Sequence, residues 1–250
     1  MTRQVEFVNR SGHTLRGIVN LPDTGVRFAS IVNIHGFTGN RSGYKNIYTH
    51  TARVLAENGF ASVRFDLYGN GESDGEFSDM TFTSILEDIE DIISWTKKQE
   101  WADPDKIILS GQSMGGYAAA TAAPRTNPYA LVLMCPGAGM WYGCKERAEA
   151  MEAKGITTAD IEGLCFSTAF NHDLYQYEPF SSASGDIGPV LLIRGTADEL
   201  VDDATCKKYE ALYPGHCTYR TIDGANHNFA SLTARAELDR LLLDFLQPLK

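Results

Sequence analysis

The feature that most constrains the fold of this chain is a regular alternation of short apolar runs with longer amphipathic segments. Strands are expected at 30–34, 61–67, 106–109, 131–134, 189–194 and 217–222, after an opening hairpin formed by 5–8 and 15–21. Apolar residues between 82 and 93 recur with the spacing of one helix face, behind Thr81 as a cap. Further helices are expected at 114–123, 203–213 and 238–246. This alternation predicts an α/β fold with a mostly parallel sheet covered on both faces.

One long segment departs from the alternation. Residues 137–188 are far too many for an ordinary connection between two elements. Within them, helical patterns are expected around 145–154 and 158–175. We therefore expect a single domain over residues 1–250, with 137–188 inserted as a small cap over one end of the sheet.

The net charge limits the kinds of partner that we expect, and the cysteine spacing predicts the redox state of the thiols. The 250 residues carry a formal net charge of -10, which argues against nucleic acid because no counterions would be released from a phosphate backbone. The chain has no basic run, and its N-terminus lacks the apolar core of a signal peptide, so we expect no membrane association and a cytoplasmic location. The five cysteines contain no Cys-x-x-Cys pair, which predicts reduced thiols.

A glycine-rich turn holds the first candidate for chemistry. Residues 106–120 pass from an apolar run through Gly-Gln-Ser113-Met-Gly into a run of alanines. Glycine weakens strands and helices alike, so a cluster of glycines where a strand becomes a helix indicates a special backbone shape. The Gly-x-Ser-x-Gly pattern is typical of a serine nucleophile held in a sharp strand-to-helix turn. An ordinary connection that contains a serine is the alternative.

An acid and a histidine follow later predicted strands. Asp198 and His227 each come just after a strand, and the carboxyl ends of strands are where open α/β sheets carry their functional residues. A serine hydroxyl is a weak nucleophile unless a histidine takes its proton, and a carboxylate orients that histidine. The sequence therefore predicts that Ser113, Asp198 and His227 act together. Asp202 and Asp203 lie nearby and remain alternatives, either as the acid or as helix caps.

Backbone N–H groups are expected to form an oxyanion hole. The N–H of Met114 begins the predicted helix beside the serine, where the helix dipole adds to its effect. We expect the second donor just after the strand 30–34, at Phe37, and we expect His35 to shape this loop. The chain lacks metal-ligand spacings, a Walker loop and a Gly-x-Gly-x-x-Gly motif, so we expect no metal and no cofactor.

Four motifs together resemble those of the α/β-hydrolase superfamily: His35-Gly-Phe-Thr-Gly, Asp66-Leu-Tyr-Gly-Asn-Gly-Glu-Ser, Gly-Gln-Ser-Met-Gly-Gly and Gly-Thr-Ala-Asp198. The first two look most like the bacterial cinnamoyl (feruloyl) esterases. The resemblance implies a triad of Ser113, Asp198 and His227, an oxyanion hole of the Phe37 and Met114 N–H groups, and a cap that binds an aromatic acyl group. Those esterases tend to place His before the serine and Gln after it, where this chain has Gln112 and Met114.

The leading hypothesis is a serine carboxylic-ester hydrolase that acts through an acyl-enzyme on a small-molecule ester, with hydroxycinnamoyl esters as the expected class and a homodimer left open. The cap aromatics are expected to line an acyl pocket, with ordinary packing of the cap as the alternative: Trp141, Tyr142, Phe166, Phe170 and Tyr175. A thioesterase, a peptidase or a short-chain acyl esterase would use the same triad. A catalytically silent hydrolase-fold binding protein is the alternative outside the enzymes.

Overall fold

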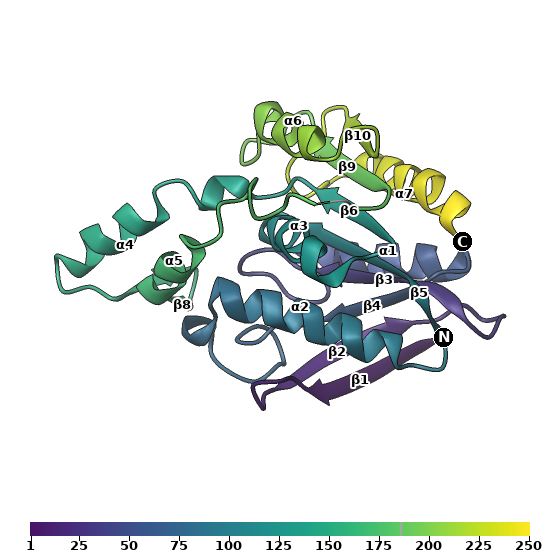
Figure 1. The fold of residues 1–250 in the computed structure, drawn as a ribbon, viewed down its shortest axis with the longest axis horizontal. Helices are drawn as coiled ribbons and strands as arrows, with labels where there is room; N and C mark the ends of the chain where they lie inside the picture. The colour runs from purple at the N-terminus through teal and green to yellow at the C-terminus, as the bar shows by residue number, and fades with distance from the viewer. Residues whose placement is uncertain (186) are drawn as a thin grey trace.

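A sheet of eight strands in the order β1-β2-β4-β3-β5-β6-β9-β10 runs through the computed structural model, which describes residues 1–185 and 187–250 (Figure 1). The strands are β1 (Thr2–Val8), β2 (Thr14–Asn20), β3 (Phe28–Ile34), β4 (Ala61–Phe65), β5 (Ala102–Gln112), β6 (Ala130–Met134), β9 (Val190–Gly195) and β10 (Cys217–Ile222). β2 is antiparallel to β1 and β4, whereas the other neighbouring strands pair in parallel. The predicted α/β fold class and its opening hairpin are confirmed.

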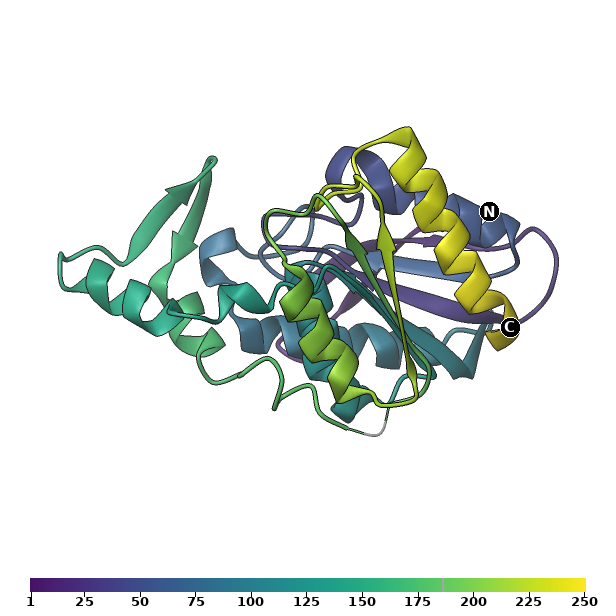
Figure 2. The ribbon, with the colours of Figure 1, turned by 90° about the horizontal axis from the view of Figure 1, so that it is seen from above.

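Helices cover both faces of the sheet (Figure 2). One face carries α1 (Ile47–Glu57) and α7 (Leu232–Leu246), and the other carries α2 (Phe82–Lys97), α3 (Met114–Thr126) and α6 (Asp203–Leu212). Short 3-10 turns complete this part of the chain at η1 (Tyr44–Asn46), η2 (Phe77–Asp79) and η4 (Gln247–Leu249). Among the helices of the described residues, none is long and apolar enough to cross a membrane.

The predicted periodicities match the buried faces of the helices. In α2 the residues at the predicted spacing are buried, and the side chain of Thr81 accepts a hydrogen bond from the N–H of Ser84 at 3.0 Å, as expected of a cap. In α7 the residues Leu238, Leu241 and Leu242 face the sheet. Helix α1 was not predicted, because Asn46 before it has a left-handed conformation with no side-chain cap and only four residues of the helix are buried.

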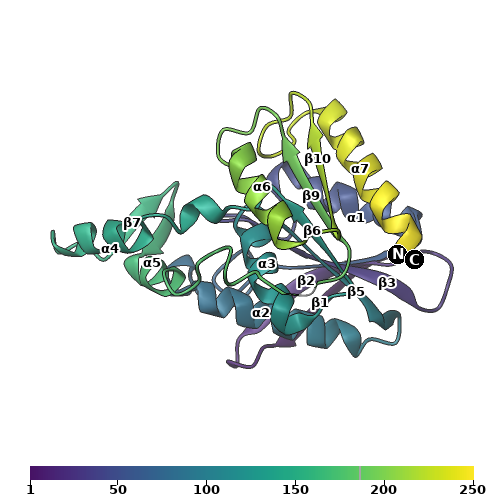
Figure 3. The ribbon, with the colours of Figure 1, turned by 45° about the horizontal axis from the view of Figure 1, so that its top comes forward.

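The cap segment, residues 137–185, is inserted between β6 and β9 and extends beyond the carboxyl ends of the parallel strands (Figures 1 and 3). Residue 186 of the predicted cap range lies outside the described residues. The segment contains η3 (Ala138–Met140), α4 (Cys144–Glu152), β7 (Thr158–Ile161), β8 (Leu164–Ser167) and α5 (Thr168–Leu174).

The first helix of the cap agrees with the sequence, but the helix predicted over 158–175 is wrong for its first half. Residues 158–167 form an antiparallel hairpin, and only α5 is helical. The hairpin turns at Glu162 and Gly163, which have φ angles of 52° and 91°. Two successive left-handed residues end a right-handed helix but suit a tight two-residue turn between strands, so the turn geometry overrides the apolar spacing.

The cap segment is anchored to the sheet domain through α2 and α3. The carboxylate of Asp173 in α5 accepts hydrogen bonds from the N–H and the hydroxyl of Thr83 at 2.6 and 2.7 Å. The Tyr177 hydroxyl joins the same Thr83 hydroxyl at 2.7 Å, and the Tyr117 hydroxyl donates to the carbonyl of Tyr177. These contacts hold the base of the cap against the helix that begins at Met114.

A buried carboxylate ties the opening hairpin to α2 and predicts a pH dependence of stability. Asp88 accepts hydrogen bonds from Asn9 Nδ2 at 2.8 Å and from the N–H of Tyr68 at 2.7 Å, and burial raises its pKa to about 6. Because the folded protein binds this proton more tightly than the unfolded chain, the contribution of Asp88 to the free energy of unfolding falls as pH rises from about 4 through about 6.

Urea unfolding of the wild type and Asp88→Asn at pH 4.5 and 7.5 tests this sign. Asparagine does not titrate, so the wild type is expected to lose roughly 2 kcal/mol relative to the variant between the two pH values. A stability difference that stays constant over this range, or that changes in the opposite direction, contradicts the predicted linkage.

Candidate active site

Ser113 lies in the turn that joins β5 to α3, with φ 57° and ψ -124°. This conformation is costly for a residue with a side chain, and the surrounding backbone enforces it. A Cβ atom at Gly111 would lie 2.1 Å from the carbonyl oxygen of Gly115, and one at Gly115 would lie 2.3 Å from the carbonyl oxygen of Ile34. The two glycines of the motif therefore allow the strand and helix to approach closely enough to force the serine outward.

The ends of β3 and β6 meet around this serine. A Cβ atom at Gly36 would lie 3.8 Å from the Ser113 hydroxyl, and one at Gly137 would lie 3.1 Å from the Met114 nitrogen. The N–H of Gly137 donates to the carbonyl of Ser113 at 2.8 Å. Gly36 thus lies beside the Ser113 hydroxyl, and Gly137 lies against the main chain of Ser113 and Met114.

Asp198 and His227, which are 29 positions apart in the chain, meet at the ends of β9 and β10. Nδ1 of His227 lies 2.8 Å from Oδ2 of Asp198, and Oδ1 of Asp198 accepts the N–H groups of Leu200 and Val201 at 2.8 and 3.0 Å. Burial acts to raise the pKa of Asp198, but these hydrogen bonds outweigh it and lower the pKa below its ordinary value. Asp198 is therefore an ionised carboxylate that fixes one nitrogen of the imidazole.

The two neighbouring acids serve the helix instead. Asp202 is the N-terminal cap of α6 and accepts the N–H of Thr205 at 2.8 Å. Asp203 pairs with Lys207 and accepts the Tyr219 hydroxyl, each at 2.8 Å. Of the three candidate acids, only Asp198 is hydrogen-bonded to His227.

Sequence reasoning missed two groups that contact the backbone of His227. Nε2 of Gln112 donates to the His227 carbonyl at 2.8 Å, and the Cys135 thiol lies 3.5 Å from the same oxygen. The hydrogen bonds thus join His227 to Asp198 and to the residue before Ser113, while the Ser113 hydroxyl takes part in none of them. The sequence did offer one signal for Gln112, which is its position directly before Ser113 in the motif. A side chain at that position lies close to the residues that surround the turn.

Cys135, Asp198 and His227 place potential metal-ligand atoms within 4.8 Å of one another. Burial raises the pKa of the Cys135 thiol well above its ordinary value, so the sulfur keeps its proton. A protonated thiol is a poor ligand, and the other two groups already satisfy each other. The geometry shown is therefore that of a histidine hydrogen-bonded to a carboxylate, with the thiol beside them.

Of the two backbone donors expected for an oxyanion hole, Met114 follows Ser113 in the chain, and Phe37 follows Gly36, where a Cβ atom would lie 3.8 Å from the Ser113 hydroxyl. Within residues 1–185 and 187–250, the N–H groups of Phe37 and Met114 have no hydrogen-bond acceptor. Burial lowers the pKa of His35, so its ring is neutral. Its Nε2 accepts the N–H of Leu67 at 3.2 Å, which places the proton on Nδ1, 2.9 Å from the Gly36 carbonyl. His35 therefore braces the loop that carries Phe37.

The five cap aromatics fall into two groups. Phe166 and Phe170 are buried and pack on the ring of Phe37, with ring centroids 5.6 and 5.8 Å from it. Trp141 and Tyr175 instead stack on each other at 5.8 Å, and Tyr142 is 46% exposed. The first group therefore lies beside the oxyanion loop, whereas the second forms an outer cluster of the cap.

Comparisons with known proteins agree with this architecture. A family model described as serine aminopeptidase, S33, matches residues 27–159, more than half of the chain. The protein YfhR of Salmonella typhimurium is 27% identical over 224 residues, covering 83% of this chain and 68% of that protein. The quorum-quenching protein AidA of Acinetobacter baumannii is 30% identical over 145 residues, covering 57% of this chain and 45% of AidA.

An uncharacterized 31.7 kDa protein of Escherichia coli is 38% identical over 96 residues, but the match spans only 32% of its length and 38% of this chain. Among solved structures, Est1E from Butyrivibrio proteoclasticus with bound ferulic acid superposes with a TM-score of 0.82 at 24% identity, covering 97% of this chain and 99% of Est1E. The Xanthomonas campestris protein XC6422, described as a serine hydrolase without a lid, gives a TM-score of 0.71 at 21% identity and covers 99% of this chain and 94% of XC6422. From its family match and its fold, this chain is a member of the serine aminopeptidase S33 family of α/β-hydrolases.

Proposed function

We propose that this protein is a serine carboxylic-ester hydrolase in which Ser113, His227 and Asp198 form the catalytic triad. The observation that carries the proposal is the 2.8 Å hydrogen bond between His227 and an ionised Asp198. Gln112, which precedes Ser113 in the strained turn at φ 57°, donates a hydrogen bond to the carbonyl of the same histidine. A strained serine turned outward, a histidine with one nitrogen fixed and two unpaired N–H groups nearby supply the parts that acyl transfer needs.

The proposed reaction proceeds through an acyl-enzyme. Ser113 Oγ attacks the ester carbonyl carbon while His227 Nε2 takes its proton, and the N–H groups of Phe37 and Met114 stabilise the oxygen that becomes negative. The tetrahedral intermediate collapses, and the departing alcohol takes the proton from His227. A water molecule then attacks the acyl carbon, loses its proton to His227, and releases the acid as Ser113 regains its hydrogen.

We further propose an aromatic acyl group as the preferred substrate, of the hydroxycinnamoyl class. The buried rings of Phe166 and Phe170 pack on the half-buried ring of Phe37, and the acyl group of a bound ester is expected to lie against this cluster. A planar aromatic acid can add an edge-to-face contact to such a cluster. The likeness in fold to Est1E, whose structure holds ferulic acid, supports the same class.

A panel of substrates tests both levels of the proposal. The wild type is expected to be labelled at Ser113 by a fluorophosphonate and to hydrolyse methyl ferulate with a higher kcat/KM than the methyl esters of short aliphatic acids. An amide and a thioester of ferulic acid belong in the panel, because the family description names an aminopeptidase. Failure of the fluorophosphonate to label Ser113 favours a silent binding protein, and faster turnover of the amide or thioester moves the function to a peptidase or thioesterase.

The acyl pocket has its own test. Phe166→Leu is expected to lower kcat/KM for methyl ferulate by about three- to tenfold while sparing methyl butyrate, since only the aromatic acyl group uses the ring contact. Tyr142→Leu is the matched control, because it removes a cap aromatic that is 46% exposed and outside the Phe37 cluster. Equal losses on both substrates, or an equal effect of the control, contradict the assignment of the acyl pocket.

A further inference from the structure

We propose that Gln112 is a positioning residue for the catalytic histidine, and that Tyr48 acts through it by fixing its side-chain amide. This inference rests on the proposed function and extends it to two residues outside the triad. Gln112 is the last residue of β5 and immediately precedes Ser113. Its side chain is 3% exposed and spans the space between α1 and the loop that carries His227.

The orientation of the amide follows from its two partners. Nε2 of Gln112 lies 2.8 Å from the carbonyl oxygen of His227, and a carbonyl can only accept, so the NH₂ group must face it. Oε1 then faces the Tyr48 hydroxyl at 2.8 Å and accepts its proton. Burial raises the pKa of Tyr48, so the hydroxyl stays protonated and remains a donor. If the tyrosine hydroxyl is removed, Oε1 of Gln112 loses the hydrogen bond that holds its end of the amide in place.

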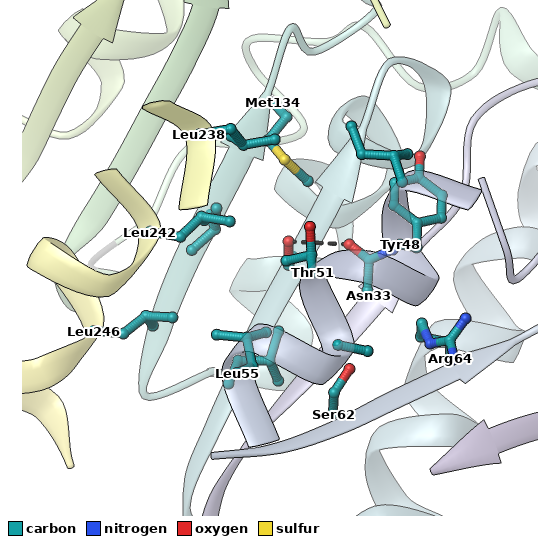
Figure 4. Close-up of a pocket in the computed structure, with 15 residues that line it drawn as sticks. Asn33, Tyr48, Thr51, Leu55, Ser62, Arg64, Met134, Leu238, Leu242 and Leu246 are labelled. Atoms are coloured by element: carbon teal, nitrogen blue, oxygen red, sulfur yellow. Dashed lines mark hydrogen bonds between the residues drawn. The ribbon is translucent and has the colours of Figure 1, made fainter. Parts of the chain in front are cut away.

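The ring of Tyr48 is buried on the side of the sheet that α1 and α7 cover. Its ring lines an internal cavity between α1, α7 and the sheet, with Leu242 and Leu246 on the opposite side (Figure 4). The residues that line this cavity include none of the triad. The ring, which is 7% exposed, can therefore remain in place when only its hydroxyl is removed.

His227 is held both at its ring and at its main-chain carbonyl. Asp198 holds Nδ1 of the ring at 2.8 Å, and Gln112 holds the main-chain carbonyl of the same residue at 2.8 Å. With both in place, Nε2 has a defined direction with respect to the serine that follows Gln112 in the chain. Without Gln112, the His227 carbonyl keeps only the longer contact with the Cys135 thiol at 3.5 Å, so the backbone can move while the ring stays bonded to Asp198. A displacement of about 1 Å can cost on the order of 10²-fold in rate.

A purely structural role for Gln112 predicts a different result. If the amide only satisfied buried polar groups, its loss would lower stability and leave kcat unchanged for the molecules that remain folded. A positioning role predicts a lower kcat with nearly unchanged KM at a temperature where both proteins are folded. It also predicts a changed signal from the His227 Nδ1 proton in the proton NMR spectrum.

The experiment compares Gln112→Met, Tyr48→Phe and the double variant with the wild type, using the best ester of the panel and the rate of fluorophosphonate labelling of Ser113. Gln112→Met is expected to lower kcat and the labelling rate by about 10- to 100-fold, and Tyr48→Phe by a smaller factor. The double variant is expected to match Gln112→Met, because Tyr48 acts only through that residue. Gln112→His, which keeps an N–H donor, is expected to recover part of the activity.

Tyr213→Phe is the matched control, since it removes another buried tyrosine hydroxyl. This hydroxyl donates to the Ala183 carbonyl at 3.3 Å and is not bonded to Gln112 or to a residue of the triad. Labelling at the wild-type rate in Gln112→Met, or multiplying losses in the double variant, overturns the positioning role. A wild type that is not labelled overturns the proposed function instead, so the two failures are distinguishable.

Discussion

Replacing Ser113 by alanine is expected to lower kcat for ester hydrolysis by about 10⁴-fold or more, because the variant has no oxygen to form the acyl-enzyme. Alanine keeps the Cβ atom and the same strained backbone, so the melting temperature is expected to stay close to that of the wild type. Stopped-flow and steady-state assays with a p-nitrophenyl ester measure the rate, and thermal unfolding measures the stability. Turnover of the variant at the wild-type rate would remove Ser113 from the mechanism.

A second variant at the same position separates strain from chemistry. Ser113→Gly is expected to be as inactive as Ser113→Ala but more stable than it, because glycine adopts φ 57° without the cost borne by other residues. The strain released is about 1–3 kcal/mol, and the extra flexibility of glycine in the unfolded chain removes part of it. A gain of about 1 kcal/mol corresponds to a rise in melting temperature of roughly 2–4 °C at this chain length. No gain would mean that the turn stores no strain.

The second large effect is expected from Asp198→Asn, which should lower kcat by about 10⁴-fold with little change in structure. The Oδ1 position of Asp198 accepts two backbone N–H groups, so the amide oxygen of the variant is held there. Its NH₂ group then faces His227 Nδ1, which must become an acceptor and shift the ring proton to Nε2. A histidine protonated on Nε2 cannot take the serine proton. The pH–rate profile and the Nδ1 proton signal in NMR check this tautomer.

The neighbouring acids provide matched controls of the same chemistry. Asp202→Asn keeps a side-chain oxygen that can cap α6, and Asp203→Asn changes a partner of Lys207 on the helix surface. Both variants are expected to retain kcat at the wild-type level. Loss of activity in either one to the degree seen for Asp198→Asn would reassign the acid of the triad.

The amino-acid sequence alone determined the fold class and the positions of most elements. Apolar runs bounded by glycine predicted the buried parallel strands, and the periodicity of 82–93 predicted α2 with its cap at Thr81. These signals are local, because burial on both faces of a strand or one face of a helix is encoded in neighbouring residues. The Gly-x-Ser-x-Gly turn belongs to the same class, since close approach of strand and helix requires glycine on both sides of Ser113.

Only the tertiary structure decided which residues meet across the chain. Three candidate acids follow β9, and the sequence favoured Asp198 because it is nearest to the strand. The structure adds the hydrogen bond to His227, which separates Asp198 from Asp202 and Asp203. Gln112 has no periodic signal, and its role depends on Tyr48, 64 positions away in α1. The cap hairpin likewise depends on a left-handed turn that the apolar spacing does not report. Local patterns encode burial, whereas pairings between distant residues arise only when the sheet brings its strand ends together. The sequence could therefore predict the Gly-x-Ser-x-Gly turn and name Asp198 and His227 as candidates, but the hydrogen bonds that join these two residues, and the contact with Gln112, came only from the fold.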